Sequence, residues 1–240
     1  MDHDWAGFRG MICERIRHDP SSSVRMSVTR GQALFNVGDR DSAVYLVERG
    51  LLNGTTYSSN GKRCLLHVYS RGDVIGEYGL LGYERQETML AMEDSIVHQI
   101  GANQFLALLE DRRLAEHFSG YLMSRLVEQQ QTITSLVTMD SEHRLAATLL
   151  RLAARLGRMH PGGLKINAKI THEDLASMVG TTRSRVGLFL KRFRSAGLVD
   201  ALPGSYLLID EVGLTDFVGS RAGSRPVDIP HRYRYADGSL

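Results

Sequence analysis

The residues with the clearest chemical potential lie at positions 170–199, in the run ITHEDLASMVGTTRSRVGLFLKRFRSAGLV. Arginine and lysine can neutralise phosphates, and hydroxyl side chains can reach base edges in the major groove of DNA. The residues placed to do so are Thr171, Thr181, Thr182, Arg183, Ser184, Arg185, Leu188, Lys191 and Arg192. This combination predicts binding of double-stranded DNA.

The apolar spacing predicts that two short helices joined by a tight turn position these residues. Gly180 ends the first apolar run, and Thr171 can cap that helix while Asp174 reaches back to it. The second run carries Val186, Phe189, Leu190 and Phe193. The residues opposite its buried stripe, at 100° per residue, are Ser184, Leu188 and Lys191. The pattern is typical of a helix-turn-helix. A solvated basic helix in an ordinary bundle is the alternative.

Catalytic and metal-binding patterns are missing from the sequence. It contains no GxxxxGK[ST] phosphate loop, no HExxH and no GxSxG. The cluster His172-Glu173-Asp174 fits the first turn of a helix, where carboxylates favour the dipole. Two cysteines, Cys13 and Cys64, are too few for a disulfide framework or a four-thiolate cluster. We therefore expect neither an enzyme nor a metal site.

Length and charge favour two soluble domains. The 240 residues suffice for two cores, and 42% hydrophobic with 23% charged residues is typical of globular proteins. No apolar run approaches ~20 residues and no signal pattern opens the sequence, so we expect a cytoplasmic chain without membrane contact. Residues 1–140 hold 14 Lys and Arg against 18 Asp and Glu, a charge of −4, whereas 141–240 hold 15 against 9, or +6. The positive charge of residues 141–240 favours binding to nucleic acid.

Five segments are expected along the chain. Residues 1–27 form a lead-in helix and loop, and residues 28–102 form roughly eight short strands of a sandwich or barrel, with Asn60-Gly61 as a hairpin turn. Residues 103–139 are helical, with a hinge at Met139-Asp140. Residues 140–215 contain the helix-turn-helix and a hairpin wing from Leu198 to Ile209. Residues 216–240 are expected to be a disordered basic tail.

The long helix within 103–139 carries an apolar stripe that could pair with a second copy of the chain. Its members are Phe118, Leu122, Leu126, Ile133 and Leu136. A stripe of this length, without an obvious partner helix, predicts a homodimer. Packing against the chain's own barrel is the alternative.

A barrel containing GDVIGEYGLLG, then a long helix, then a winged helix-turn-helix resembles the family of the cyclic-AMP receptor protein and the fumarate–nitrate reduction regulators (Crp/Fnr). The resemblance covers nearly all of residues 28–210. It implies an α+β chain: an N-terminal jelly-roll-like β-barrel, a long dimerisation helix and a C-terminal winged helix-turn-helix. It also implies a homodimeric transcription regulator that binds a palindromic operator, responds to an effector and contacts RNA polymerase.

The family's effector pocket carries over only in part. Gly76, Glu77, Arg85 and Arg125 match its pattern, so a cyclic nucleotide, cAMP or cGMP, is a possible ligand. The residues that depart from the pattern are Gln86, Glu87, Gln129 and Gln130. Gln129 can still donate and accept hydrogen bonds, so it stays a candidate residue of the effector pocket. A carboxylate at Glu87 would repel the phosphate unless it points away or pairs with Arg85. Three alternatives stay open: a barrel that has lost its ligand, one that holds a haem at Cys64 or His67, and one that senses redox change through the Cys64 thiol.

The reading helix departs from the family as well. Arg183 and Ser184 occupy the early positions, but Leu188 stands where a later arginine is common. Leucine can touch a thymine methyl and cannot make the bidentate contact to guanine. We therefore expect an operator unlike the family's usual half-site.

Overall fold

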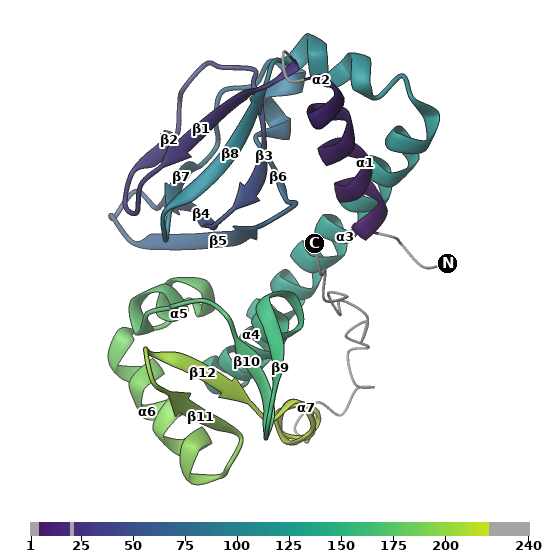
Figure 1. Ribbon diagram of the computed structural model, residues 1–240. Coiled ribbons are helices and arrows are strands. Elements are labelled where there is room, and N and C mark those ends of the chain that lie inside the picture. The colour runs from purple at the N-terminus through teal and green to yellow at the C-terminus, as the bar shows by residue number, and fades with distance from the viewer. Residues whose placement is uncertain (1–4, 20–21, 221–240) are drawn as a thin grey trace. The chain divides into compact units, whose positions relative to one another are not determined.

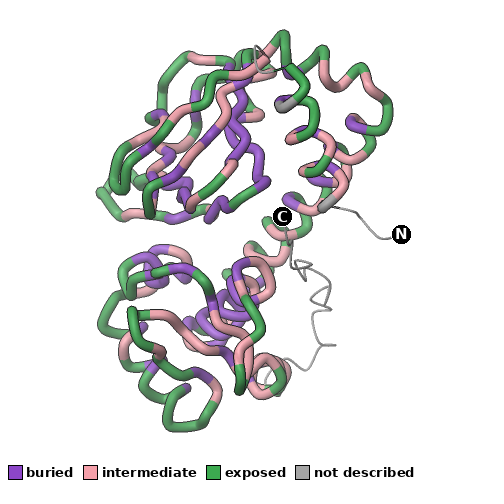
Figure 2. Tube along the Cα trace, in the orientation of Figure 1, coloured by how far each residue is buried: buried purple, intermediate pink, exposed green. Residues whose placement is uncertain are grey.

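Residues 5–19 and 22–220 are described by the computed structural model, which divides into two compact units, residues 1–131 and 132–240 (Figure 1). The boundary between the units falls inside one long helix, α3 (Arg112–Thr138). Each unit has its own buried residues (Figure 2), so each is described by itself.

The N-terminal unit contains eight antiparallel strands. They are β1 (Val24–Val28), β2 (Ala33–Phe35), β3 (Val44–Arg49), β4 (Leu51–Tyr57), β5 (Arg63–Ser70), β6 (Val74–Ile75), β7 (Thr88–Ala91) and β8 (Ser95–Ile100). Two four-stranded sheets have the orders β1-β8-β3-β6 and β2-β7-β4-β5, which is the strand order of a jelly roll. The expected jelly-roll-like fold is confirmed. The expected start at residue 28 was late, because β1 begins at Val24 and pairs with β8 over its whole length.

The core of this jelly roll lies between the two sheets. Its members come from both of them and include Tyr45, Val47, Leu52, Tyr69, Met89 and Val97. The Asn60-Gly61 turn joins β4 to β5, and Gly61 has a φ of 78°, which glycine adopts without strain. The 3-10 helix η2 (Glu77–Leu81) follows β6 and begins at Gly76, whose φ is 86°.

Three helices accompany the strands: α1 (Trp5–His18), α2 (Ala102–Leu108) and the first part of α3. Phe8, Ile12 and Ile16, four residues apart, line one buried side of α1. They pack in one cluster with Phe105, Phe118 and Tyr121. Phe118 is therefore 7% exposed and belongs to this unit's own core, which corrects its expected place on a dimerisation stripe. Leu122 packs partly against the same cluster.

The helical run breaks where the sequence predicted a hinge. Helix α3 ends at Thr138 and α4 (Ser141–Leu156) begins after Asp140, whose side chain accepts from the backbone N–H groups of Glu142 and His143. These bonds favour the ionised carboxylate and hold the pKa of Asp140 at about 2. The break at Met139-Asp140 is thus confirmed as the start of a capped helix.

The rest of the C-terminal unit contains β9 (Gly157–His160), β10 (Gly163–Ile166), α5 (His172–Val179), α6 (Arg183–Ser195), β11 (Val199–Leu202), β12 (Tyr206–Ile209) and α7 (Glu211–Gly219). Its sheet has the order β11-β12-β10-β9. The hairpin of β11 and β12 confirms the expected wing. Strands β9 and β10 were missed, because GRMHPGGLKI has little β-branched character.

Helix α7 also corrects the expected tail. Residues 216–219 were expected to be disordered and instead form the end of this helix. Its Leu214 is fully buried, and Phe217 stacks on His143 of α4 with ring centroids 4.7 Å apart. These contacts explain why so short a helix is stable. Residues 221–240 lie outside the described residues.

Candidate nucleic-acid interface and effector site

The two helices of the helix-turn-helix begin and end at the residues that the sequence indicated. Thr171 accepts from the backbone N–H of Asp174, and the Asp174 carboxylate accepts from the N–H of Thr171 at 3.1 Å. Gly180 ends α5 with a φ of 71°. The Thr182 hydroxyl accepts from the N–H of Arg185 at the start of α6. Caps at both helices and a left-handed glycine between them fix the turn.

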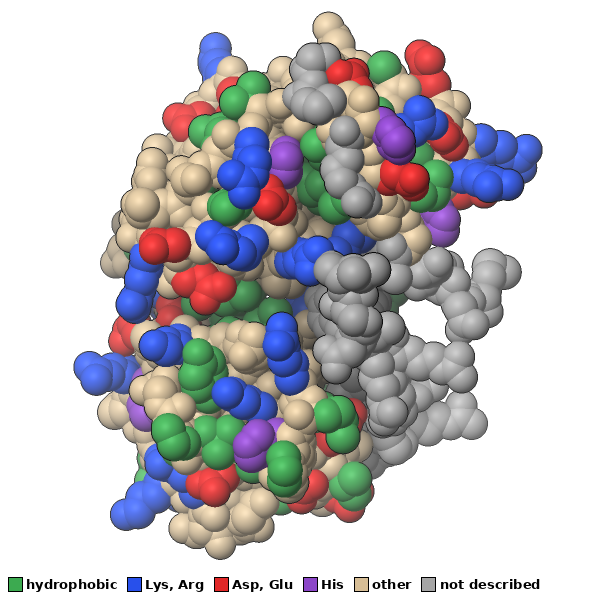
Figure 3. Space-filling model, in the orientation of Figure 1, with side chains coloured by type: hydrophobic (Ala, Val, Ile, Leu, Met, Phe, Trp, Pro, Cys, Tyr) green, Lys and Arg blue, Asp and Glu red, His purple; other side chains and the backbone are tan. Residues whose placement is uncertain are grey.

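Helix α6 buries one side and exposes the other. The buried residues are Val186, Phe189, Leu190 and Phe193, the full predicted set. The exposed residues are the N-cap Thr182 and, within the helix, Arg183, Ser184, Arg185, Leu188, Lys191, Arg192, Arg194 and Ser195. Leu188 is 48% exposed, which leaves its methyl groups available to a partner. Figure 3 shows lysine and arginine side chains spread over this unit with apolar groups between them.

The cationic side chains of α6 differ in the contacts that they make within the chain. Arg192 donates to Glu142 of α4 at 3.1 Å, and the Arg185 guanidinium lies 5.6 Å from the Phe189 ring of its own helix. Among the described residues, no ion pair or hydrogen bond involves the side chain of Arg183 or Lys191; the Ser195 hydroxyl donates only to the Lys191 carbonyl. The side chains of Arg183 and Lys191 are therefore available to a partner, while Arg192 links α6 to α4.

Arg144 of α4 positions the helix-turn-helix, and no pattern in the sequence pointed to it. Its Nε donates to the carbonyl of Val179, the last residue of α5, at 3.0 Å. Its Nη1 donates to the carbonyl of Met139, just before α4, at 2.6 Å. One guanidinium thus joins the helix break to the first helix of the pair.

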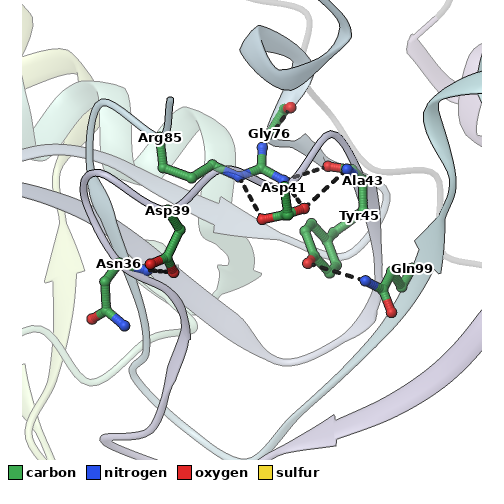
Figure 4. A network of polar contacts seen from close by, with 8 residues as sticks. All are labelled: Asn36, Asp39, Asp41, Ala43, Tyr45, Gly76, Arg85 and Gln99. Atoms are coloured by element: carbon green, nitrogen blue, oxygen red, sulfur yellow. Dashed lines mark hydrogen bonds and ion pairs between the residues drawn. The ribbon is translucent and has the colours of Figure 1, made fainter. Parts of the chain in front are cut away.

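Arg85 lies at the centre of the candidate effector site, and Figure 4 shows its partners. It is 2% exposed, and its Nη1 donates to the Gly76 carbonyl at 2.7 Å. Its Nε donates to Asp41 Oδ2 at 3.0 Å, and its Nη2 donates to Asp41 Oδ1 and to the Ala43 carbonyl. The guanidinium also lies 4.4 Å from the centre of the Phe35 ring. The chain itself therefore engages every nitrogen of the Arg85 guanidinium.

Gly76 is required by this arrangement, because a Cβ there would overlap Nη1 of Arg85. The structure thus brings Gly76 and Arg85 together as the sequence indicated. Asp41 was missed. It lies 44 residues from Arg85 in sequence, and no local pattern marks it as the partner.

A second group of side chains surrounds Glu87. Tyr69 of β5 donates from its hydroxyl to Glu87 Oε1 at 3.3 Å, and the Arg125 guanidinium of α3 lies 4.8 Å from the Tyr69 ring centre. Burial first, and then repulsion from Glu77, raises the pKa of Glu87 to about 7. Burial also raises the pKa of Glu77. This part of the site is acidic in character.

Gln129, from the predicted effector pocket, and Gln86, which departs from the family's pattern, have contacts of their own. Gln129 of α3 is exposed, and its Nε2 lies 3.4 Å from His67 Nε2. Gln86 is exposed, and its Nε2 donates to the Glu84 carbonyl at 2.9 Å. In the part of the chain that the structure describes, no group of three or more His, Cys, Asp or Glu side chains could hold a metal ion.

Helix α3 exposes apolar side chains along much of its length. They are Met123, Leu126, Val127, Ile133, Leu136 and Val137. The predicted stripe members Leu126, Ile133 and Leu136 are 55%, 61% and 48% exposed. Among the helices described, none is long and apolar enough to cross a membrane.

Comparison with known proteins identifies both units. Residues 25–112 match the cyclic nucleotide-binding domain, and residues 143–217 match the Crp-like helix-turn-helix domain. The cAMP-activated global transcriptional regulator CRP of Pasteurella multocida is 30% identical over 172 residues, 70% of this chain and 81% of that protein. The transcriptional regulatory protein btr of Bordetella pertussis is 27% identical, and the match covers 82% of each chain.

Solved structures agree with these matches. A CRP/FNR family transcriptional regulator from Thermus thermophilus is 28% identical with a TM-score of 0.66, covering 82% of this chain and all of that one (100%). A CooA mutant from Carboxydothermus hydrogenoformans shares the fold, with a TM-score of 0.71 at 23% identity, covering 82% of this chain and 88% of that one. The relatives that match in sequence are regulators and not enzymes. The chain belongs to the Crp/Fnr family of DNA-binding transcription regulators.

Proposed function

We propose that two copies of this chain bind a palindromic operator in double-stranded DNA and thereby regulate transcription. The observation that carries the proposal is the exposed side of α6, where the cations Arg183 and Lys191 flank the hydroxyl of Ser184 and the methyl groups of Leu188. Cations suit phosphates, and a short polar group beside an apolar one can distinguish base edges. The caps at Thr171 and Thr182 hold this helix in a fixed orientation.

Dimerisation through α3 supports a two-fold operator. Leu126, Ile133 and Leu136 are each about half exposed or more, at positions that recur along the helix. Large apolar side chains exposed in a row mark interaction surfaces in soluble proteins. An identical helix from a second copy can cover them and place two α6 helices on one side of the duplex, with half-sites about one helical turn apart.

RNA polymerase is a further proposed partner, since regulators that bind upstream of genes act by helping or hindering it.

The proposal includes an effector that acts through the N-terminal unit. A cyclic nucleotide is the ligand implied by the domain match, but the residues present do not fit its phosphate, because Arg85 is neutralised by Asp41 and Glu87 adds a carboxylate. These two observations favour a second candidate: a regulator that responds to another kind of ligand, or to none.

Selection of bound fragments from random DNA with the full-length chain tests the function. We expect an enriched two-fold symmetric motif, with specific binding at least ~1,000-fold tighter than binding to random DNA. The mass of the protein in solution, measured by sedimentation, should be that of a dimer. Enrichment of no motif, with equal and strongly salt-dependent binding to all sequences, would mean that the chain is a nonspecific DNA binder.

A further inference from the structure

The site around Arg85 and Glu87 differs in charge from one built to hold a phosphate. A phosphate needs unpaired cations or N–H donors directed at it. Arg85 is the buried cation beside the matching Gly76-Glu77 pair, and its Nε, Nη1 and Nη2 all donate to Asp41, Gly76 or Ala43. Its charge is thus already balanced within the chain.

Glu87 is neither paired with Arg85 nor turned out to solvent. Its carboxylate lies directly over Gly54 of β4, where a Cβ would overlap Oε2. Among the described residues, Oε2 is the only buried side-chain nitrogen or oxygen without a hydrogen-bond partner. Oε1 receives one long bond from Tyr69. The carboxylate therefore points into the unit, where its Oε2 is a hydrogen-bond acceptor without a donor.

The surroundings of Glu87 do not cancel its charge. The groups that act on it are Tyr69 on β5, Glu77 on η2, Arg125 on α3 and Arg85 before β7. Arg85 is balanced by Asp41, and Arg125 also pairs with Glu128 at 3.3 Å. The carboxylates of Glu77 and Glu87 therefore share one remaining cation, Arg125, which Glu128 also engages. An anion placed beside them would meet net negative charge.

We infer that Glu87 sets the ligand specificity of this unit: its partly buried carboxylate, when ionised, weakens the binding of anionic cyclic nucleotides and favours, at that place, a neutral or cationic group that donates hydrogen bonds. This inference rests on the proposed function in that it concerns the effector site of a regulator. Among the residues that depart from the nucleotide-binding pattern, it identifies Glu87 as the one whose charge acts on the ligand.

Calorimetric titration of the full-length chain with cAMP and cGMP tests the inference. At about pH 8 the unmodified chain should bind both weakly, whereas Glu87→Gln and Glu87→Ala should each bind about 10-fold more tightly once the repulsion is gone. Glu93→Gln is the matched control, since it removes the same charge from an exposed position of the same unit. That variant should behave like the unmodified chain.

The pH dependence separates a charge effect from a change of shape. Because the pKa of Glu87 is about 7, cAMP affinity of the unmodified chain should rise about 10-fold from pH 8 to pH 6 as one proton is taken up. The phosphodiester stays ionised throughout, so the Glu87→Gln variant should show no such rise.

The inference is overturned if Glu87→Gln and Glu87→Ala bind cAMP and cGMP no more tightly than the unmodified chain, or if Glu93→Gln gives the same gain. Circular dichroism of each variant shows whether it is folded, and Gln, with nearly the volume of Glu, is the variant least disturbing to the packing. Operator binding is measured in parallel. If the unmodified chain binds no operator, the proposed function is refuted. The nucleotide titration still tests the role of Glu87, because it does not depend on DNA binding.

Discussion

Replacing Glu87 by Gln should have no effect on stability below about pH 4.5 and should stabilise the chain increasingly above it, up to about pH 8. In the folded chain the pKa of Glu87 rises from 4.5 to about 7, first because burial disfavours the charged form and then because Glu77 repels it. At 1.36 kcal/mol per unit of pH, this rise corresponds to about 3 kcal/mol of stability lost when the carboxylate ionises within the fold. Solvent reaching the partly exposed side chain reduces the expected gain to about 2 kcal/mol.

The sign follows from proton uptake. Between pH 4.5 and about 7 the folded chain holds a proton at Glu87 that the unfolded chain has lost, so stability falls as pH rises through this window. Gln carries no such proton. The Glu87→Gln chain should therefore match the unmodified chain below about pH 4.5 and exceed it increasingly up to about pH 8.

Thermal unfolding followed by circular dichroism at several pH values measures this difference. A gain of about 2 kcal/mol corresponds to a rise in Tm of roughly 5 °C at about pH 8 for a chain of this size. Glu93→Gln controls for the change in net charge. A Tm difference that is the same in acid and base, or no stabilisation at high pH, would refute the account of a buried, poorly satisfied carboxylate.

Four further outcomes are expected. Arg183→Ala should cost ~1–3 kcal/mol of operator affinity and relax preference at one base pair, measured by fluorescence anisotropy on single-base operator variants. Lys191→Ala should weaken binding to all DNA sequences alike. It should also reduce the slope of log K against log salt concentration by about one, because one phosphate contact is lost. Arg144→Ala should lower operator affinity while leaving the dimer intact in sedimentation, with partial rescue in Arg144→Lys, because only one of its two carbonyl bonds can be replaced. Ile133→Glu should shift the sedimenting species to a monomer, since a charge at a position that is 61% exposed in one copy would be buried between two.

Local sequence determined most of the DNA-reading part. Capping at Thr171 and Thr182, the left-handed turn at Gly180 and the buried stripe of α6 depend on neighbours within a few residues, so spacing and residue type were sufficient. The same holds for the break at Met139-Asp140 and for the eight short strands, whose turns mark them. Each of these features is set by hydrogen bonds and periodicity along the chain.

Only the tertiary structure decided which of the residues that match the family's effector pattern can still contact a ligand. Arg85 fits a phosphate-binding pattern in sequence, yet Asp41, brought to it by the jelly-roll topology, balances its charge. Phe118 has the spacing of a dimerisation residue, but α1 folds back and buries it. Glu87 could have pointed to solvent, and its position over Gly54 follows from strand pairing between β4 and β7. Such contacts join residues far apart in sequence, and periodicity along the chain carries no information about them.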